Sequence, residues 1–198
     1  QVQVLSGAPQ NQLLTKNNLY TWLISFMITT STQDSSLAQR LRRETTAEVL
    51  FDEFSRGLYS TDASIYQIKP LGVVVPKTEE DVLATLSIAN DTGVSVTMRG
   101  GGTSQCGQTV GEGIIVDVSK HLNRLISVDP ETRRAVVQPG IVLDQLNALL
   151  KPHRLFFPVD VSTSSRATIG GMTANNSCGA RSIRYGKMVD NVRAVDAV

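Results

Sequence analysis

The sequence predicts an α/β (α+β) fold that begins with a parallel strand–helix–strand unit. Two observations predict it. Short apolar runs rich in Val and Ile alternate with a stretch of helical period, and Pro and Gly residues mark the boundaries between them. The chain has 198 residues, of which 41% are hydrophobic and 19% charged, a composition typical of a soluble globular protein.

The first part of the chain is predicted to be an N-terminal extension over residues 1–33. Its apolar run, Leu19 to Ile28, is shorter than the about 20 residues that a membrane-spanning helix needs. The run could be the apolar region of a secretory signal peptide, but the small-x-small pattern of a signal-peptide cleavage site does not follow it. We therefore expect no membrane span and a cytoplasmic protein. Residues 35–54 are then predicted to form one helix, because apolar residues recur near a 3.6-residue period, at Leu37, Leu41, Val49, Leu50 and Phe54.

The parallel unit follows a polar connector. An apolar run over 71–75, bracketed by two prolines, is predicted to be a short buried strand. Thr78 is a good N-cap residue with three acidic residues after it, and Gly93 is a typical stop signal, so a helix is expected between them. A second strand is expected over 94–98.

The later elements are shorter. A strand is predicted over 114–118, and an antiparallel pair over 126–128 and 134–138, joined by the turn-forming sequence Asp-Pro-Glu-Thr. A helix is predicted over 141–150, ended by a proline. Residues 192–198 are predicted to be a further strand in which the sequence stops, so we expect a fold that is incomplete at the C-terminus.

Several classes of function find no support. A formal net charge of +1 provides no bulk field for nucleic acid or anionic lipid. Cys106 and Cys178 are too few for a disulfide scaffold, and without a Cys-x-x-Cys motif, and with His121 and His153 each standing alone, they predict no metal site. We expect the two cysteines to be small residues that fill glycine-rich loops. No nucleophilic triad is visible, so no catalytic residue is assigned.

The strongest local signal is the run from Arg99 to Ser104, Arg-Gly-Gly-Gly-Thr-Ser, directly after a predicted strand. Consecutive glycine amides form a concave nest for an anion, two hydroxyls add donors, and a pyrophosphate suits that chemistry. The alternative is a flexible surface loop. The dinucleotide fingerprint would need glycine where Gln105 stands, and a P-loop would need lysine where Gln108 stands, so both motifs are disfavoured.

A second signal is the stretch from Thr168 to Gly179, which is rich in glycine, hydroxyl and amide groups. Such a stretch lets the backbone approach a flat ring whose heteroatoms it can bind. A glycine-rich turn followed by an Asn-capped helix is the alternative. Between the two signals lie the rigid turns Gln138–Gly140 and Phe156–Asp160, neither of which indicates a function alone.

Taken in order, these stretches resemble the FAD-binding domain of the vanillyl-alcohol-oxidase superfamily, also called PCMH-type. The resemblance runs from about Ile68 to Val198 and rests on the opening with its two prolines and Asp81-Val82, the phosphate loop, the Pro-Gly turn, the Thr-x-Gly-Gly segment and Tyr185-Gly186. It implies a two-subdomain PCMH-type fold. The chain then divides into an extension (1–33), a helical lead-in (34–66) and the N-terminal part of the FAD-binding domain (67–198).

The resemblance also implies roles. The phosphate loop would cradle the FAD pyrophosphate, and the later segments would line the flavin and its ribityl chain. Covalent members carry a His where Thr103 stands, so the flavin should be held non-covalently. The cofactor-binding residues it implies are Arg99, Gly100, Gly101, Gly102, Thr103, Ser104, Gly107, Gln108, Pro139, Gly140, Pro158, Asp160, Thr168, Ile169, Gly170, Gly171, Asn175, Ser177 and Gly179.

Within the family, the chain most resembles FAD-linked 2-hydroxyacid dehydrogenases such as those acting on D-lactate and D-2-hydroxyglutarate, chiefly over Ser55 to Tyr66. This implies a flavin oxidoreductase whose partners are a small hydroxy acid, an electron acceptor and a catalytic cap domain beyond Val198. The alternatives are the FAD subunit of a molybdenum hydroxylase, a flavin reductase of the same fold, or a non-catalytic nucleotide-binding module.

Overall fold

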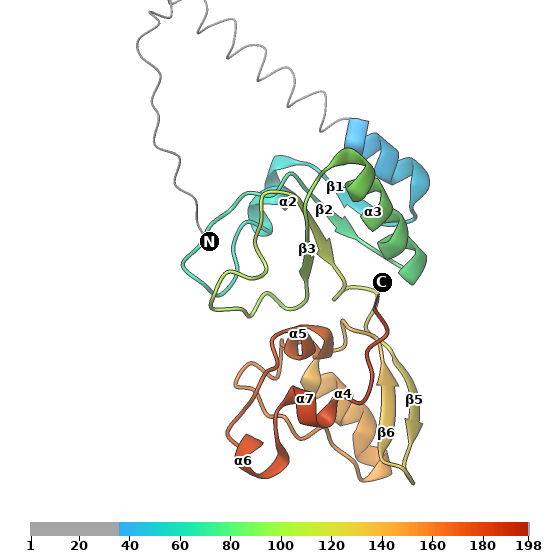
Figure 1. Cartoon of the computed structure of the whole chain (residues 1–198), viewed down its shortest axis with the longest axis vertical. Coiled ribbons are helices and arrows are strands. Elements are labelled where there is room, and N and C mark those ends of the chain that lie inside the picture. The colour runs from blue at the N-terminus through green and yellow to red at the C-terminus, as the bar shows by residue number, and fades with distance from the viewer. Residues whose placement is uncertain (1–35, 198) are drawn as a thin grey trace, which may run out of the picture.

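The computed structural model describes residues 36–197, so the extension predicted over 1–33 lies outside the described residues. The chain forms two lobes in succession, one built on a larger sheet and one on a hairpin with short helices (Figure 1). Each lobe has a hydrophobic cluster of its own, around Leu41 and Ile114 in the first and around Leu146 and Met172 in the second. The mixed α/β class and the two subdomains are those that the sequence predicts.

A four-stranded sheet organises the first lobe. Its strands are β1 (Glu48–Leu50), β2 (Gly72–Val75), β3 (Val96–Arg99) and β4 (Ile114–Asp117), in the spatial order β1-β2-β4-β3. β1 pairs antiparallel with β2, and the other pairs are parallel. Every residue of β2 and β4 is buried, as expected of strands covered on both faces. The three strands predicted here are confirmed, with β4 inserted between the two strands of the predicted unit.

Helix α3 (Glu79–Thr92) confirms the local end signals in the sequence. Thr78 and Asp81 form a reciprocal capping box, and Gly93 ends the helix in the left-handed region at φ +66°. The Asp81 carboxylate also accepts hydrogen bonds from the amides of Thr46 (2.7 Å) and Lys77 (2.9 Å). Burial by itself raises the pKa of Asp81, but these hydrogen bonds outweigh it and hold the pKa below its ordinary value.

The single helix predicted over 35–54 is wrong. Residues 36–44 are helical, but β1 and helix α2 (Glu53–Leu58) follow as separate elements. The first helix ends where both the amide and the hydroxyl of Thr45 bond the Leu41 carbonyl, at 3.0 and 2.7 Å. Val49 then pairs with Val74 of β2. Pairing with a strand distant in sequence therefore overrides the local helical period.

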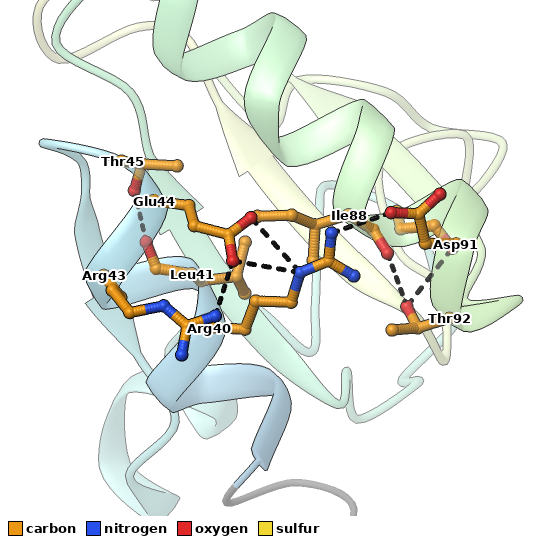
Figure 2. A network of polar contacts seen from close by, with 9 residues as sticks. Arg40, Leu41, Arg43, Glu44, Thr45, Ile88, Asp91 and Thr92 are labelled. Carbon is orange, nitrogen blue, oxygen red and sulfur yellow. Dashed lines mark hydrogen bonds and ion pairs between the residues drawn. The ribbon is translucent and has the colours of Figure 1, made fainter.

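The helix over 36–44 packs on α3 of the first lobe, as Figure 2 shows. Arg40 bridges the two helices: its guanidinium lies 2.7 Å from Asp91 of α3 and 3.2 Å from Glu44 of its own helix. These ion pairs are partly exposed to solvent, which screens them, so they contribute little to the stability of the fold. Leu37 and Leu41 are buried in the cluster of the first lobe, and their burial holds the helix in place.

The second lobe begins with the predicted hairpin, β5 (Leu125–Asp129) and β6 (Arg134–Val137), which is confirmed. Helix α4 (Leu143–Leu150) is also confirmed, and a 3-10 turn (Lys151–His153) containing the proline follows it. Three short helices complete the lobe: α5 (Ile169–Ala174), α6 (Ser182–Tyr185) and α7 (Met188–Asn191).

The strand predicted over 192–198 is wrong for the residues that can be judged. Residues 192–197 have no regular secondary structure, and Val198 lies outside the described residues. The segment is rich in apolar residues, but a strand forms only beside a partner, and no strand within 36–197 pairs with this segment. Within residues 36–197, no helix combines the length and hydropathy needed to span a bilayer.

Candidate cofactor site

The predicted phosphate loop lies at the carboxyl end of β3. Arg99 is the last residue of that strand, and residues 100–113 cross over to the parallel neighbour β4. Gly102 and Gly107 have φ values of +64° and +76°. A residue with a Cβ is strained in that region, so the loop's turns need glycine at these two positions.

Four successive amides in this loop have no protein acceptor. Within residues 36–197, the backbone N–H groups of Gly101, Gly102, Thr103 and Ser104 donate to no carbonyl or side chain. The Ser104 hydroxyl accepts from the amides of Cys106 and Gln108 further along the loop. Adjacent free donors of this kind are the chemistry of an anion nest, so the loop fits the pyrophosphate of a dinucleotide cofactor.

The Arg99 side chain packs beneath the loop. Its Nη1 donates to the carbonyl oxygens of Thr109 (3.3 Å) and Tyr59 (3.5 Å), and its guanidinium carbon lies 5.2 Å from the centre of the Tyr59 ring. A Cβ built on Gly102 would lie 2.7 Å from Nη2 of Arg99. The guanidinium is therefore enclosed between the tyrosine ring and the Gly102 backbone.

The segment 59–66, from the lead-in, encloses the loop on its outer side. The amide of Ala63 donates to the Gly102 carbonyl at 3.2 Å, and Thr109 donates to the Asp62 carboxylate at 3.0 Å. Burial by itself raises the pKa of Asp62. Hydrogen bonds from Thr109 of the loop and from Ser64 in its own turn lower the pKa by more, so it lies below its ordinary value. A Cβ on Gly107 would lie 2.7 Å from the ring of Tyr66.

The two sequence signals meet in space. A Cβ built on Gly100 would lie 2.2 Å from Oγ1 of Thr168, and one on Gly101 would lie 2.2 Å from the Arg166 carbonyl oxygen. Both distances are far below a van der Waals contact, so the loop backbone touches the second lobe directly. These two glycines are therefore required by the approach of the other lobe, whatever the loop binds.

The Thr-x-Gly-Gly segment forms the start of α5. Thr168 is buried and caps the helix, accepting from the amide of Gly171 at 3.3 Å, and Ile169 donates to the Ile141 carbonyl at 2.9 Å. The amide of Gly170 donates to the Pro139 carbonyl at 2.8 Å. The predicted Pro139-Gly140 turn, where the Gly140 amide bonds Leu122 at 2.7 Å, thus packs directly against this segment.

Asp160 fixes the last predicted segment. Its carboxylate accepts from the Arg181 amide at 2.9 Å and pairs with the Arg181 guanidinium at 3.4 Å, while Gly179 packs against its carbonyl. Its half-buried neighbour Pro158 precedes the buried Val159. Further along the segment, Asn175 bonds the Ser177 hydroxyl at 3.2 Å and accepts from Gln108 of the phosphate loop at 3.5 Å.

Tyr59, Asp117 and Arg166 contact the loop or its support and are missed by the sequence reasoning. Tyr59 falls in the Ser55 to Tyr66 stretch that carries part of the resemblance, but the sequence assigns no role to any of the three, because each acts through a contact distant in sequence. Both cysteines are exposed and unpaired, so they do not fill space as expected. Over residues 36–197 no cluster of potential metal ligands is found. Two hollows, near α6 and near α7, are lined by residues from Thr173 to Val195 and include none of the loop.

Comparison with known proteins identifies the family to which these residues belong. The family model described as "FAD binding domain" matches residues 70–198. A D-2-hydroxyglutarate dehydrogenase of Escherichia coli (strain K12) is 46% identical over 142 residues, and glycolate oxidase subunit GlcD of Bacillus subtilis (strain 168) is 37% identical over 153. These matches cover 70% and 75% of this chain but only 14% and 32% of the two relatives.

Among solved structures, an alkyldihydroxyacetonephosphate synthase superposes with a TM-score of 0.71 at 23% identity, covering 79% of this chain and 34% of that protein. At that identity the likeness concerns the fold, and it agrees with the predicted PCMH-type architecture. The family model covers well over half of the chain, and the matched residues include both Gly100 of the loop and Thr168 at the start of α5, which contact each other. The chain therefore belongs to the FAD binding domain family.

Proposed function

We propose that this chain is the FAD-binding part of an oxidoreductase that converts a D-2-hydroxy acid to its 2-oxo acid. The cofactor half of the proposal rests on the four free amides of Gly101 to Ser104. The substrate half rests on the relatives named D-2-hydroxyglutarate dehydrogenase and glycolate oxidase subunit. The chain spans about one seventh of the length of the former, so the activity is a proposal about the whole protein.

The residues of the chain would divide the work of holding FAD. The amides of the loop would donate to the pyrophosphate, and Thr103 would add a hydroxyl donor. The Ser104 hydroxyl donates to the side-chain carbonyl of Gln108 in this structure, so it would have to turn to reach the pyrophosphate. The start of α5 and the segment 175–179 would line the ring and ribityl chain from the second lobe. FAD when bound would accept a hydride from C2 of the hydroxy acid, whose hydroxyl proton would pass to a base outside this chain.

Thr103 bears on how the cofactor is held. By the resemblance, it stands where covalent members of the family have a histidine, so the histidine that would carry the covalent bond is missing here. We propose that binding is non-covalent. In that case the contribution of this chain to FAD affinity comes from hydrogen bonds and packing of the loop and the α5 segment, without a covalent bond.

The test uses the full-length protein under anaerobic conditions. Flavin absorbance is followed after adding D-lactate, D-2-hydroxyglutarate, their L forms or a phenolic alcohol. Bleaching by a D-2-hydroxy acid alone is expected. Bleaching by the phenolic alcohol and by no hydroxy acid would overturn the substrate class, and purified protein without any flavin spectrum, even after incubation with FAD, would overturn the cofactor.

A further inference from the structure

Arg99 carries a positive charge that no carboxylate within 36–197 neutralises. Its guanidinium makes no ion pair there, although Asp117 is its register partner on β4. The Asp117 carboxylate is committed elsewhere, since one oxygen accepts from the Tyr59 hydroxyl at 2.6 Å and the other from the amide and hydroxyl of Ser119, at 2.8 and 2.6 Å. The guanidinium is thus left with its charge unmatched beside the phosphate loop.

The donors of Arg99 are also only partly used. Nη1 bonds two carbonyl oxygens, whereas Nε and Nη2 donate to no acceptor among the described residues. Nη2 is the atom nearest to a Cβ built on Gly102, and Nε is also within 3.3 Å of that point. The unused donors therefore lie against the turn whose neighbouring amides are free. A half-buried cation with unused donors next to free amides is suited to an anion.

Tyr59 determines where this cation lies. Its ring covers the guanidinium at 5.2 Å, and its hydroxyl is anchored to the buried Asp117 at the end of β4. Its carbonyl accepts one of the Arg99 hydrogen bonds, and Ala63, four residues later, fixes the Gly102 carbonyl. The same short segment thus holds both the cation and the glycine turn above it.

We propose that Tyr59 is a positioning residue of the FAD site, which holds the Arg99 guanidinium beneath Gly102 so that its charge acts on the pyrophosphate bound by the loop. This rests on the proposed function. Tyr59 lies before residue 70, where the match to the family model begins. The lead-in is then a working part of the cofactor site and more than a connection to it.

Tyr59 is expected to affect FAD binding only through Arg99, so the single and double variants of these two residues should show a specific pattern of FAD affinities. Tyr59→Leu removes the ring and the anchored hydroxyl, and Arg99→Gln removes the charge while keeping a shorter side chain that can still donate a hydrogen bond. Each is expected to raise the dissociation constant for FAD about tenfold. The double variant should resemble Arg99→Gln alone, because two changes in one chain of contacts are not additive. Independent structural damage would instead multiply the two effects.

The experiment titrates FAD into the apo form of the full-length protein and follows flavin fluorescence. Phe54→Leu is the matched control, because it removes an aromatic ring from the same lead-in at a position that is 75% exposed. It should bind FAD as the wild type does. Thermal melts of each apoprotein establish that the variants are folded.

Wild-type affinity in Tyr59→Leu, or a double variant whose loss equals the product of the two single losses, would overturn the proposal. If Tyr59→Leu does not fold, the test is made with Arg99→Gln, which leaves the Tyr59 ring in place. Unchanged FAD affinity in Arg99→Gln would also overturn the proposal. Absence of FAD binding by the wild-type protein would instead refute the proposed function itself, so the two failures are distinguishable.

Discussion

Replacing Gly101 by alanine should displace the phosphate loop from the second lobe. The new Cβ would lie 2.2 Å from the Arg166 carbonyl oxygen, whereas ordinary contacts of a Cβ lie at 3.4 Å or more, so about 1 Å of movement is needed. The carbonyl cannot easily yield, because its turn is fixed by hydrogen bonds from the amides of Arg166 and Ala167 to Thr163, both at 2.8 Å. The loop must move instead.

The expected cost follows from that overlap. Overpacking of this kind lowers the free energy of unfolding by about 1–3 kcal/mol. A shift of the free amides weakens one or two hydrogen bonds to a charged group, each worth about 1.5–3 kcal/mol, so FAD affinity should fall by about ten- to a hundredfold. The assay is a melt of the full-length protein, with an FAD titration of its apo form.

Gly57→Ala is the matched control for Gly101→Ala. It makes the same chemical change in helix α2, where a new Cβ meets nothing within 4 Å and φ is not positive. Alanine in a helix should stabilise the protein by about 0.5–1 kcal/mol and leave FAD affinity unchanged. The reasoning is refuted if Gly101→Ala matches the wild type in both melting temperature and FAD affinity.

Three further predictions concern other parts of the chain. If Thr103 marks a non-covalent site, acid precipitation of the full-length holoprotein should release all of the flavin, and colour left in the pellet would contradict it. Asp81→Ala leaves the Thr46 amide without its acceptor and should lower the free energy of unfolding at pH 7 by about 1–3 kcal/mol. Because the pKa of Asp81 is depressed in the folded state, its stabilisation is complete above about pH 4 and is lost as the pH falls further, so wild type and variant should converge in acid melts. The 198-residue chain on its own should self-associate, because Ile183 and Val195 are fully or largely exposed on the second lobe, and it should hold FAD weakly. A monomer by gel filtration that carries FAD and unfolds in a sharp thermal transition would disprove this.

Local chemistry accounts for the elements that the sequence predicts correctly. Helix α3 has its start and stop signals within its own boundaries, at Thr78 and Gly93, and the hairpin β5–β6 carries its turn between its strands. The helix predicted over 35–54 fails because Val49 belongs to a strand whose partner lies in β2. The strand predicted over 192–198 fails for the converse reason, since an apolar pattern does not supply a partner.

In the candidate site, too, the sequence predicts the features that depend on local residues and misses those that depend on contacts distant in sequence. The glycine run identifies a turn with free amides, because glycine content and position after a strand are local properties. The sequence does not reveal that Gly100 and Gly101 are small because Thr168 and Arg166 abut them. The sequence marks Tyr59 only as part of the Ser55 to Tyr66 stretch, and it does not reveal the contact of Tyr59 with a cation forty residues later in the chain.

The place of β4 in the sheet has a consequence for how the nascent chain folds. β4 lies between β2 and β3 but is synthesised after both, so neither parallel pair can form until residue 117 has left the ribosome. β1 and β2 can pair earlier, leaving the other edge of β2 open to misassociation during synthesis. Residues 100–113 immediately precede β4, so the phosphate loop acquires its shape in the same step that closes the sheet. A pause in synthesis can therefore favour correct pairing of β2, β4 and β3 only if it comes after residue 117 has emerged from the ribosome.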